Sequence, residues 1–168
     1  MNKKTTNIKI VLYEPRIPQN TGCIARTTAS LKVELILIQP LGFSLESKYL
    51  KRAGLDYWPL VKLTVFENFY QYIESVRPNE RIIGCSKKNG SNLFEFDFKN
   101  GDNLLFGRED IGLPEDIRNL CYKIVSIPMP GISNQDGTGG VRSLNLSVAA
   151  GIISFQAAYK LNLLTFKK

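Results

Sequence analysis

The chain has 168 residues, 43% hydrophobic and 22% charged, and the 22 basic side chains outnumber the 15 acidic ones. It contains no histidine, which excludes histidine-based catalysis. Its three cysteines (Cys23, Cys85 and Cys121) are widely spaced, which excludes the usual structural zinc sites and is typical of thiols in a reducing compartment. No apolar run reaches the ~20 residues that span a bilayer, and nothing at the amino terminus resembles a secretory signal. We therefore expect one domain over residues 1–168, with its core over about 7–161, in the cytoplasm or, if a presequence has been removed, in an organelle. The basic balance favours a polyanionic partner such as nucleic acid, although a simply basic protein would show it too.

Short apolar runs alternate with helical patterns along the chain. Near-continuous apolar runs are typical of parallel strands covered on both faces, and six such runs predict strands over 8–14, 33–39, 60–66, 81–86, 102–107 and 123–129. Helices are expected over 20–32, 47–54, 67–76 and 114–121, and a final helix begins within 142–147. The alternation predicts an α/β protein with a parallel sheet and flanking helices.

The final helix has apolar residues on two sides. One stripe at helical spacing contains Leu144, Val148, Ile152, Phe155 and Tyr159, and a second contains Ile153, Ala157 and Leu161. If one side covers the sheet, the other needs a partner, so we expect a homodimer. The alternative is a monomer in which this helix is fully buried.

The segment EPRIPQNTGCIAR (14–26) lies just past the first expected strand. Its prolines stiffen a loop, and Asn20 or Thr21 can cap the helix that follows. Ligands of open α/β sheets bind at the carboxyl ends of the strands. Arg26, about two turns into this helix, is therefore a candidate for gripping a phosphate; as a lone residue it would be an ordinary surface charge.

Two later segments have the same relation to a strand. In LLFGREDIGLP (104–114), Gly107 would allow a ligand to approach the backbone, and Gly112 suits a turn with positive φ. The segment matches neither the dinucleotide nor the P-loop signature, and a tight connection between elements is the alternative. In the second segment, a glycine-rich loop leads into RSLNLS, where Ser143 or Asn145 can cap the final helix. We expect these loops and the first one to converge on one crevice.

Together, several segments resemble those of a known family in order and spacing: NIKIVLYEPRIPQNTGCIAR, KRAGLDYW, LLFGREDIGLP, IPMPG and RSLNLSVAAGI. The family is the SPOUT superfamily of S-adenosylmethionine-dependent RNA methyltransferases, and within it the chain is most similar to the TrmL (YibK-like) group, which methylates the 2′-hydroxyl of cytidine or uridine 34 in tRNA. The resemblance implies a carboxyl-terminal deep trefoil knot, a methyl-donor pocket formed by the knot loops, and a homodimer through the knot-region helix.

The resemblance also implies roles for individual residues. The methyl donor is expected against Cys85, Gly107, Ile127, Ser143 and Asn145, without a metal ion. Arg26 matches the proposed catalytic position, and Asn20 and Glu109 match further polar motif positions. Candidate tRNA contacts are Lys48, Lys51, Arg52 and Arg142; for the first three, a solvated helix face is the alternative. Since arginine stays protonated, we expect Arg26 to hold the target phosphate and stabilise the developing alkoxide.

Two features depart from the family pattern. The loop between Pro130 and Arg142 is longer than in the shortest members, and Phe155 stands where some members have a tyrosine, a role that Tyr159 could take. Three other interpretations remain open. They are a SPOUT enzyme acting on another tRNA position or on ribosomal RNA, a non-catalytic RNA-binding module on the same fold, and a small-molecule α/β enzyme, which the basic charge disfavours.

Overall fold

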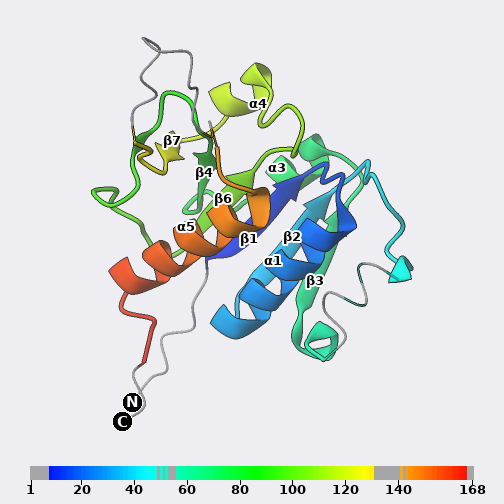
Figure 1. Cartoon of the computed structure of the whole chain (residues 1–168). Helices are drawn as coiled ribbons and strands as arrows, with labels where there is room; N and C mark the ends of the chain where they lie inside the picture. Colours follow the sequence, from blue (N-terminus) through cyan, green and yellow to red (C-terminus); the bar gives the residue numbers. More distant parts are fainter. Residues whose placement is uncertain are drawn as a thin grey trace.

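A computed structural model describes residues 8–48, 50, 52, 56–130, 141 and 143–165 of the chain. Its centre is a seven-stranded sheet with the order β3-β2-β1-β6-β4-β7-β5, in which neighbouring strands are parallel (Figure 1). The strands are β1 (Lys9–Tyr13), β2 (Glu34–Ile38), β3 (Lys62–Phe66), β4 (Arg81–Cys85), β5 (Ser91–Asn92), β6 (Asp102–Phe106) and β7 (Lys123–Ser126). The α-helices are α1 (Pro18–Leu31), α3 (Phe69–Ser75), α4 (Glu115–Asn119) and α5 (Leu146–Lys160), and a 3₁₀ turn, η1 (Trp58–Leu60), precedes β3.

The expected parallel α/β sheet is confirmed, and each of the six expected strands is present with shorter ends. The largest difference is in the strand expected over 123–129, which ends at Ser126. Pro128 and Pro130 follow, and proline has no N–H to donate to a sheet ladder. The short strand β5 has no apolar pattern and was not predicted.

The first helix begins two residues earlier than expected. Pro18 occupies its first turn, where its fixed φ suits a helix and its missing N–H costs nothing. The N-cap is Ile17, which makes no side-chain cap. Asn20 and Thr21 therefore lie inside the helix and are buried, and the prediction that one of them caps it was wrong.

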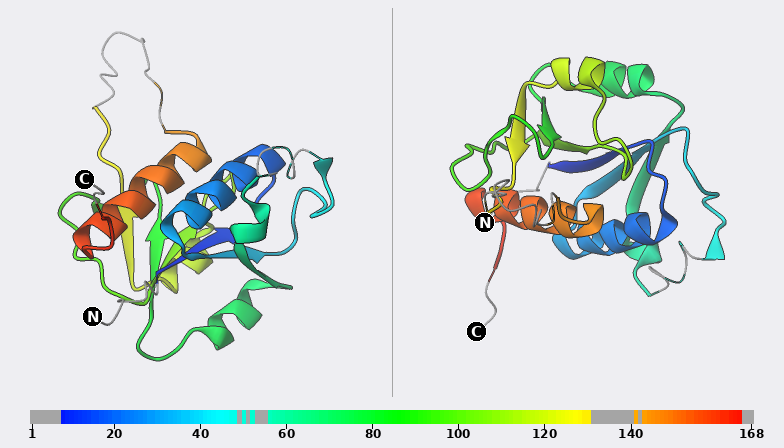
Figure 2. Two further views of the ribbon diagram at one scale, coloured as in Figure 1. Left: turned by 90° about the horizontal axis from the view of Figure 1, so that it is seen from below. Right: turned by 45° about the horizontal axis from the view of Figure 1, so that its top comes forward.

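Helices cover both faces of the sheet. Figure 2 shows α1 and α5 on one face and α3 and α4 on the other. Alternate strand residues divide between two cores: Ile10 and Leu12 pack beneath α1 and α5, whereas Val11 packs beneath α3 and α4. Burial on both faces explains why the strands are near-continuous apolar runs.

The two apolar stripes of α5 have different surroundings. Ile153 and Ala157 are 3% and 0% exposed and form part of the core with α1. The other stripe faces outward: its members Val148, Ile152, Phe155 and Tyr159 are between 36% and 67% exposed. The alternative of a fully buried helix in a monomer was therefore wrong. The expected homodimer, which would cover this face, stays a prediction.

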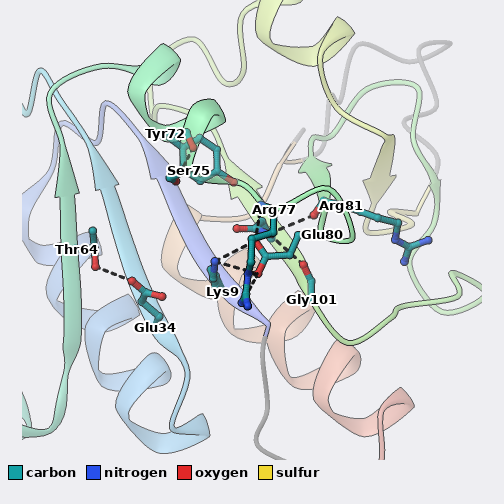
Figure 3. A network of polar contacts seen from close by, with 10 residues as sticks. Lys9, Glu34, Thr64, Tyr72, Ser75, Arg77, Glu80, Arg81 and Gly101 are labelled. Carbon is teal, nitrogen blue, oxygen red and sulfur yellow. Dashed lines mark hydrogen bonds and ion pairs between the residues drawn. The ribbon is translucent and has the colours of Figure 1, made fainter.

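Ion pairs lie at the edge of the sheet where the strands begin, and Figure 3 shows those around Glu80. The Glu80 carboxylate, 2% exposed, accepts hydrogen bonds from Lys9 Nζ at 3.1 and 3.2 Å and from Arg77 at 2.8 and 3.1 Å. Arg81 donates two bonds of 2.7 Å to Asp102. Lys9, Arg81 and Asp102 are the first residues of β1, β4 and β6. The Arg81–Asp102 pair therefore joins the neighbouring strands β4 and β6, and the Lys9–Glu80 pair joins β1 to the segment just before β4.

Some expected features involve residues outside the described ranges. The trefoil knot depends on the path between β7 and α5, and residues 131–140 and Arg142 lie outside the described residues, so the knot and the contacts of the long loop stay predictions. Lys51 also lies outside them. Within the described ranges, no helix is both long and apolar enough to cross a membrane.

Candidate active site

A cavity of about 700 Å³ lies at the carboxyl edge of the sheet. Its walls come from the loops that follow β1, β4, β6 and β7, together with the first turns of α5. This volume is within the range of small-molecule and cofactor sites. The predicted convergence of loops on one crevice is therefore observed, with a fourth loop added.

Each residue expected at the methyl donor lines this cavity: Cys85, Gly107, Ile127, Ser143 and Asn145. Asn20 and Glu109 line it too. The apolar side chains of Phe106, Leu113 and Ile153 contribute further lining. The cavity therefore combines an apolar floor with polar groups at its loops, which is typical of cofactor sites.

Three polar side chains from three loops are joined by hydrogen bonds. Asn145 Nδ2 donates to Asn20 Oδ1 at 3.1 Å, and Asn20 Nδ2 donates to Glu109 Oε1 at 3.3 Å. Glu109 also accepts the backbone N–H of Arg16 at 2.8 Å and of Ile17 at 3.1 Å. Both of its oxygens are thus engaged, and the carboxylate lies at the favourable positive end of α1. Glu109 positions the two amides and the start of α1 relative to the loop after β6.

Asn145 has a second function at the start of α5. Its Oδ1 accepts the backbone N–H of Ser147 at 2.8 Å and the hydroxyl of Ser147 at 2.7 Å. Asn145 is therefore the N-cap of α5, which confirms one of the two expected caps. One amide both begins the helix and joins the network to Asn20.

The loop after β6 folds back on itself at its two glycines. Arg108 and Gly112 exchange backbone hydrogen bonds of 3.1 and 2.9 Å, and Gly112 has the expected positive φ of 72°. A Cβ on Gly107 would meet the backbone of Gly112 and Leu113. The absence of a side chain at Gly107 is therefore first a requirement of this turn, not of an approaching ligand, although the residue does line the cavity.

Arg26 does not line the cavity. It is exposed on α1, whereas Asn20 on the same helix is buried. Its guanidinium carbon lies 4.4 Å from the centroid of the Tyr57 ring, which is a cation–π contact. The structure thus gathers the expected polar residues with the exception of the proposed catalytic arginine.

The expected tRNA contacts of the basic segment lie elsewhere. Lys48 and Arg52 are exposed and have helical backbone, and Leu50 between them is fully buried. Neither basic residue lines the cavity. The RNA contact of this basic segment therefore stays a prediction.

The loop after β4 adds Ser86, Lys87 and Lys88 to the cavity wall, and none of these three residues was predicted from the sequence. A signal was present, because an Asn-Gly pair, typical of a turn, follows the two lysines just past an expected strand. Arg118 of α4 also lines the cavity and was not predicted.

The ionisable groups of the cavity wall differ in their protonation and in their ion pairs. Burial raises the pKa of the Cys85 thiol well above 9.0, so it is a neutral group and not a nucleophile. Arg108 donates to Asp110 at 2.6 and 2.9 Å, and these bonds lower the pKa of that carboxyl to about 2. Arg108 also lies 3.5 Å from Glu14, so its charge is compensated within the chain.

A parallel α/β sheet with a cofactor-sized cavity at its carboxyl edge is the architecture of a cofactor-binding α/β enzyme. Comparison with known proteins identifies the family. The model of the SpoU rRNA Methylase family matches residues 7–155, and the chain belongs to this family. A tRNA (cytidine(34)-2′-O)-methyltransferase of Methylovorus glucosotrophus is 39% identical over 148 residues, covering 88% of this chain and 92% of the relative.

Two solved structures extend the comparison. One, from work on the 2-OH methylation of C/U34 on tRNA, is 44% identical with a TM-score of 0.86, covering 94% of this chain and 97% of that one. A SpoU methyltransferase of Streptomyces viridochromogenes in complex with the cofactor AdoMet shares the fold at 22% identity, with a TM-score of 0.79 over 95% of this chain and 63% of that one.

Proposed function

We propose that the protein transfers a methyl group from S-adenosylmethionine to the ribose 2′-hydroxyl of nucleotide 34, a cytidine or uridine, in tRNA. The observation that carries the proposal is the hydrogen-bonded joining of Asn20, Glu109 and Asn145, from three separate motifs, at one cofactor-sized cavity. The relative named for this activity and the solved structure from work on C/U34 methylation match this chain over 92% and 97% of their own lengths. For an enzyme that acts on tRNA, we propose a cytoplasmic location.

The cavity suits S-adenosylmethionine in size and lining. Phe106, Leu113 and Ile153 offer apolar contacts to a nucleoside, and the loops at Gly107 and Ile127 bring backbone groups to the wall. Ser143 and Asn145 add hydroxyl and amide groups, and Cys85 adds a neutral thiol. When bound, the cofactor supplies an activated methyl group on a sulfonium sulfur.

The residues of the chain then have to orient the ribose and assist the loss of the 2′-hydroxyl proton. Correct positioning of two reactants is worth up to ~7–11 kcal/mol of a barrier, and the network anchored on Glu109 holds Asn20 and Asn145 in fixed places for it. The chain has no histidine to act as a base, so the hydroxyl proton passes to solvent water as the methyl group is transferred. Arg26 therefore serves by holding a phosphate of the target and stabilising the developing alkoxide.

Arg26 lies outside the cavity lined by its own chain. For its role, the bound RNA must extend from the cavity across α1, or a partner protomer must bring its Arg26 to the cavity mouth. We propose the homodimer on the exposed apolar face of α5, where Val148, Ile152 and Phe155 are 49%, 36% and 44% exposed. Mixed dimers of an Arg26 variant and a cavity variant separate the two routes, because only the second restores activity to such a mixture.

The test is methylation of unfractionated tRNA with labelled methyl donor, followed by digestion, mass spectrometry of the nucleosides and mapping. We expect 2′-O-methylcytidine or 2′-O-methyluridine at position 34. Label at another tRNA position, or in ribosomal RNA alone, would assign the enzyme to a related specificity. RNA binding without any methyl transfer, together with no affinity for S-adenosylhomocysteine, would leave a non-catalytic module.

A further inference from the structure

Two lysines stand together at the rim of the cavity, on the loop between β4 and β5. Lys87 and Lys88 are exposed, and both contribute to the cavity wall. Arg118 of α4 lines the same wall. Three cationic side chains are thus grouped where the cavity opens to solvent.

The loop that carries these lysines is held in place by neighbouring elements. The carbonyl of Ser86 accepts a 2.6 Å hydrogen bond from the Ser126 hydroxyl, and the carbonyl of Lys88 accepts one of 3.1 Å from Arg118. Lys88 N–H also donates to the Ser86 hydroxyl at 3.2 Å. At Gly90 a Cβ would overlap Ser126, so the loop lies directly against the end of β7. The backbone of both lysines is therefore fixed relative to the cavity.

These cations differ from other basic groups at this end of the molecule in having no compensating charge. Arg108 pairs with Asp110 and Glu14, and Arg16 pairs with Glu14. Among the residues that the structure describes, no carboxylate lies within ion-pair distance of Lys87 or Lys88. Arg118 donates to the carbonyl oxygen of Lys88, and its Nε is buried and has no hydrogen-bond partner among the described residues.

We infer that Lys87, Lys88 and Arg118 form a binding site for RNA backbone phosphates, next to the nucleotide whose ribose enters the cavity. The inference rests on the proposed function in taking RNA as the substrate. The cofactor does not account for these charges, because S-adenosylmethionine has one carboxylate against its own ammonium and sulfonium groups and is itself cationic. A polyanion with a phosphate at every nucleotide does account for them, since each lysine that neutralises a phosphate releases a counterion.

The test compares a double variant, K87A/K88A, with a matched double variant, K62A/K123A. Lys62 and Lys123 are exposed and begin β3 and β7, so they lie at the opposite edge of the sheet. Affinity for unfractionated tRNA is measured by filter binding at several salt concentrations, and affinity for S-adenosylhomocysteine by calorimetry. We expect K87A/K88A to bind tRNA about tenfold more weakly at low salt, and to lower the slope of log affinity against log salt by about 1.4–1.8, the contribution of two phosphate contacts. S-adenosylhomocysteine affinity stays unchanged.

A further variant guards against a change in the loop itself. K87R/K88R retains both charges and is expected to bind tRNA with nearly wild-type affinity. Weakened S-adenosylhomocysteine binding with unchanged tRNA binding would overturn the inference and assign the lysines to the cofactor carboxylate. Equal losses in K62A/K123A would also overturn it, because they would indicate only a general charge effect. If the wild-type protein methylates no RNA but loses RNA affinity in K87A/K88A, the phosphate site stands and the proposed function falls.

Discussion

The guanidinium of Arg26 stacks on the ring of Tyr57 at 4.4 Å, so two segments far apart in the chain, α1 and the turn before η1, are joined at the proposed catalytic cation. The contact holds Arg26 over the surface of α1 without using its hydrogen-bond donors. A guanidinium stacked in this way keeps its N–H groups available for a phosphate.

Arg26→Ala is expected to lower kcat for tRNA methylation by about 100-fold or more, the usual cost of removing a group that stabilises developing negative charge. Affinity for S-adenosylhomocysteine, measured by calorimetry, should not change, because Arg26 does not line the cavity. Lys62→Ala serves as the control for loss of a surface cation. Unchanged turnover in Arg26→Ala would remove this residue from the mechanism.

Tyr57→Leu tests the stacking contact. An exposed cation–π contact is worth about 0.5–1 kcal/mol, so we expect kcat to fall about two- to fivefold, while Tyr57→Phe keeps the ring and stays close to wild type. In an Arg26→Ala background, Tyr57→Leu should have no further effect, since the two residues act as a unit. Additive losses in the double variant would contradict the assignment of Tyr57 as a positioning residue.

Glu109→Gln is expected to destabilise the fold as well as weaken the site. The new amide places a donor opposite one of the N–H groups of Arg16, Ile17 or Asn20, and an unsatisfied group of this kind costs about 1–3 kcal/mol. Urea unfolding measures the loss, and calorimetry follows cofactor affinity. Asp97→Asn, at a side chain 85% exposed, is the matched control and should change stability by less than about 0.5 kcal/mol. Equal unfolding midpoints for the two variants would speak against the network.

Phe155→Asp is expected to give a monomer in sedimentation or light-scattering measurements. Phe155 is 44% exposed on the outward stripe of α5, and a charge there cannot be buried against an apolar partner. Tyr70→Asp is the control, because Tyr70 is 73% exposed on α3, on the other face of the sheet. A wild-type protein that is monomeric at micromolar concentration would remove the homodimer from the proposal.

The stability of the protein should fall in acid through Glu80. Burial raises the pKa of Glu80, but the hydrogen bonds from Lys9 and Arg77 outweigh it and hold the pKa below 4.5. A carboxyl group whose pKa is lowered by folding contributes stability above its unfolded pKa and loses it as the pH falls through the folded value. Glu80→Gln should therefore be less stable near neutral pH and lose less stability between about pH 6 and pH 3. Urea titrations across this range check the slope, with Glu95→Gln at an exposed site as control.

Much of the fold could be predicted because its central strands are buried on both faces. The resulting apolar runs are visible in the sequence at β1, β2 and β6, and the order of strands and helices follows from them. The two-residue strand β5 has no such pattern and could not be found. The helix start at Pro18 was missed because Asn20 is a favourable capping residue, and the helix was therefore expected to begin two residues later.

The candidate site was predicted where it depends on short motifs and missed where it depends on placement. Motif residues such as Glu109 and Asn145 follow strands of the same sheet and therefore meet at its carboxyl edge. The location of Arg26 away from that cavity depends on which face of α1 turns outward, and its contact with Tyr57 joins segments with no shared pattern. Lys87 and Lys88 resemble an ordinary solvated pair until their neighbours in space are known.

Trp58, the single tryptophan of the chain, directly follows Tyr57 and is half-buried against the core at η1. Its indole is therefore an intrinsic fluorophore one residue from the ring that the proposed catalytic arginine contacts. We expect RNA that binds Arg26 to change the polarity around this tryptophan, so that stopped-flow measurement of its emission would time substrate binding in the unlabelled protein.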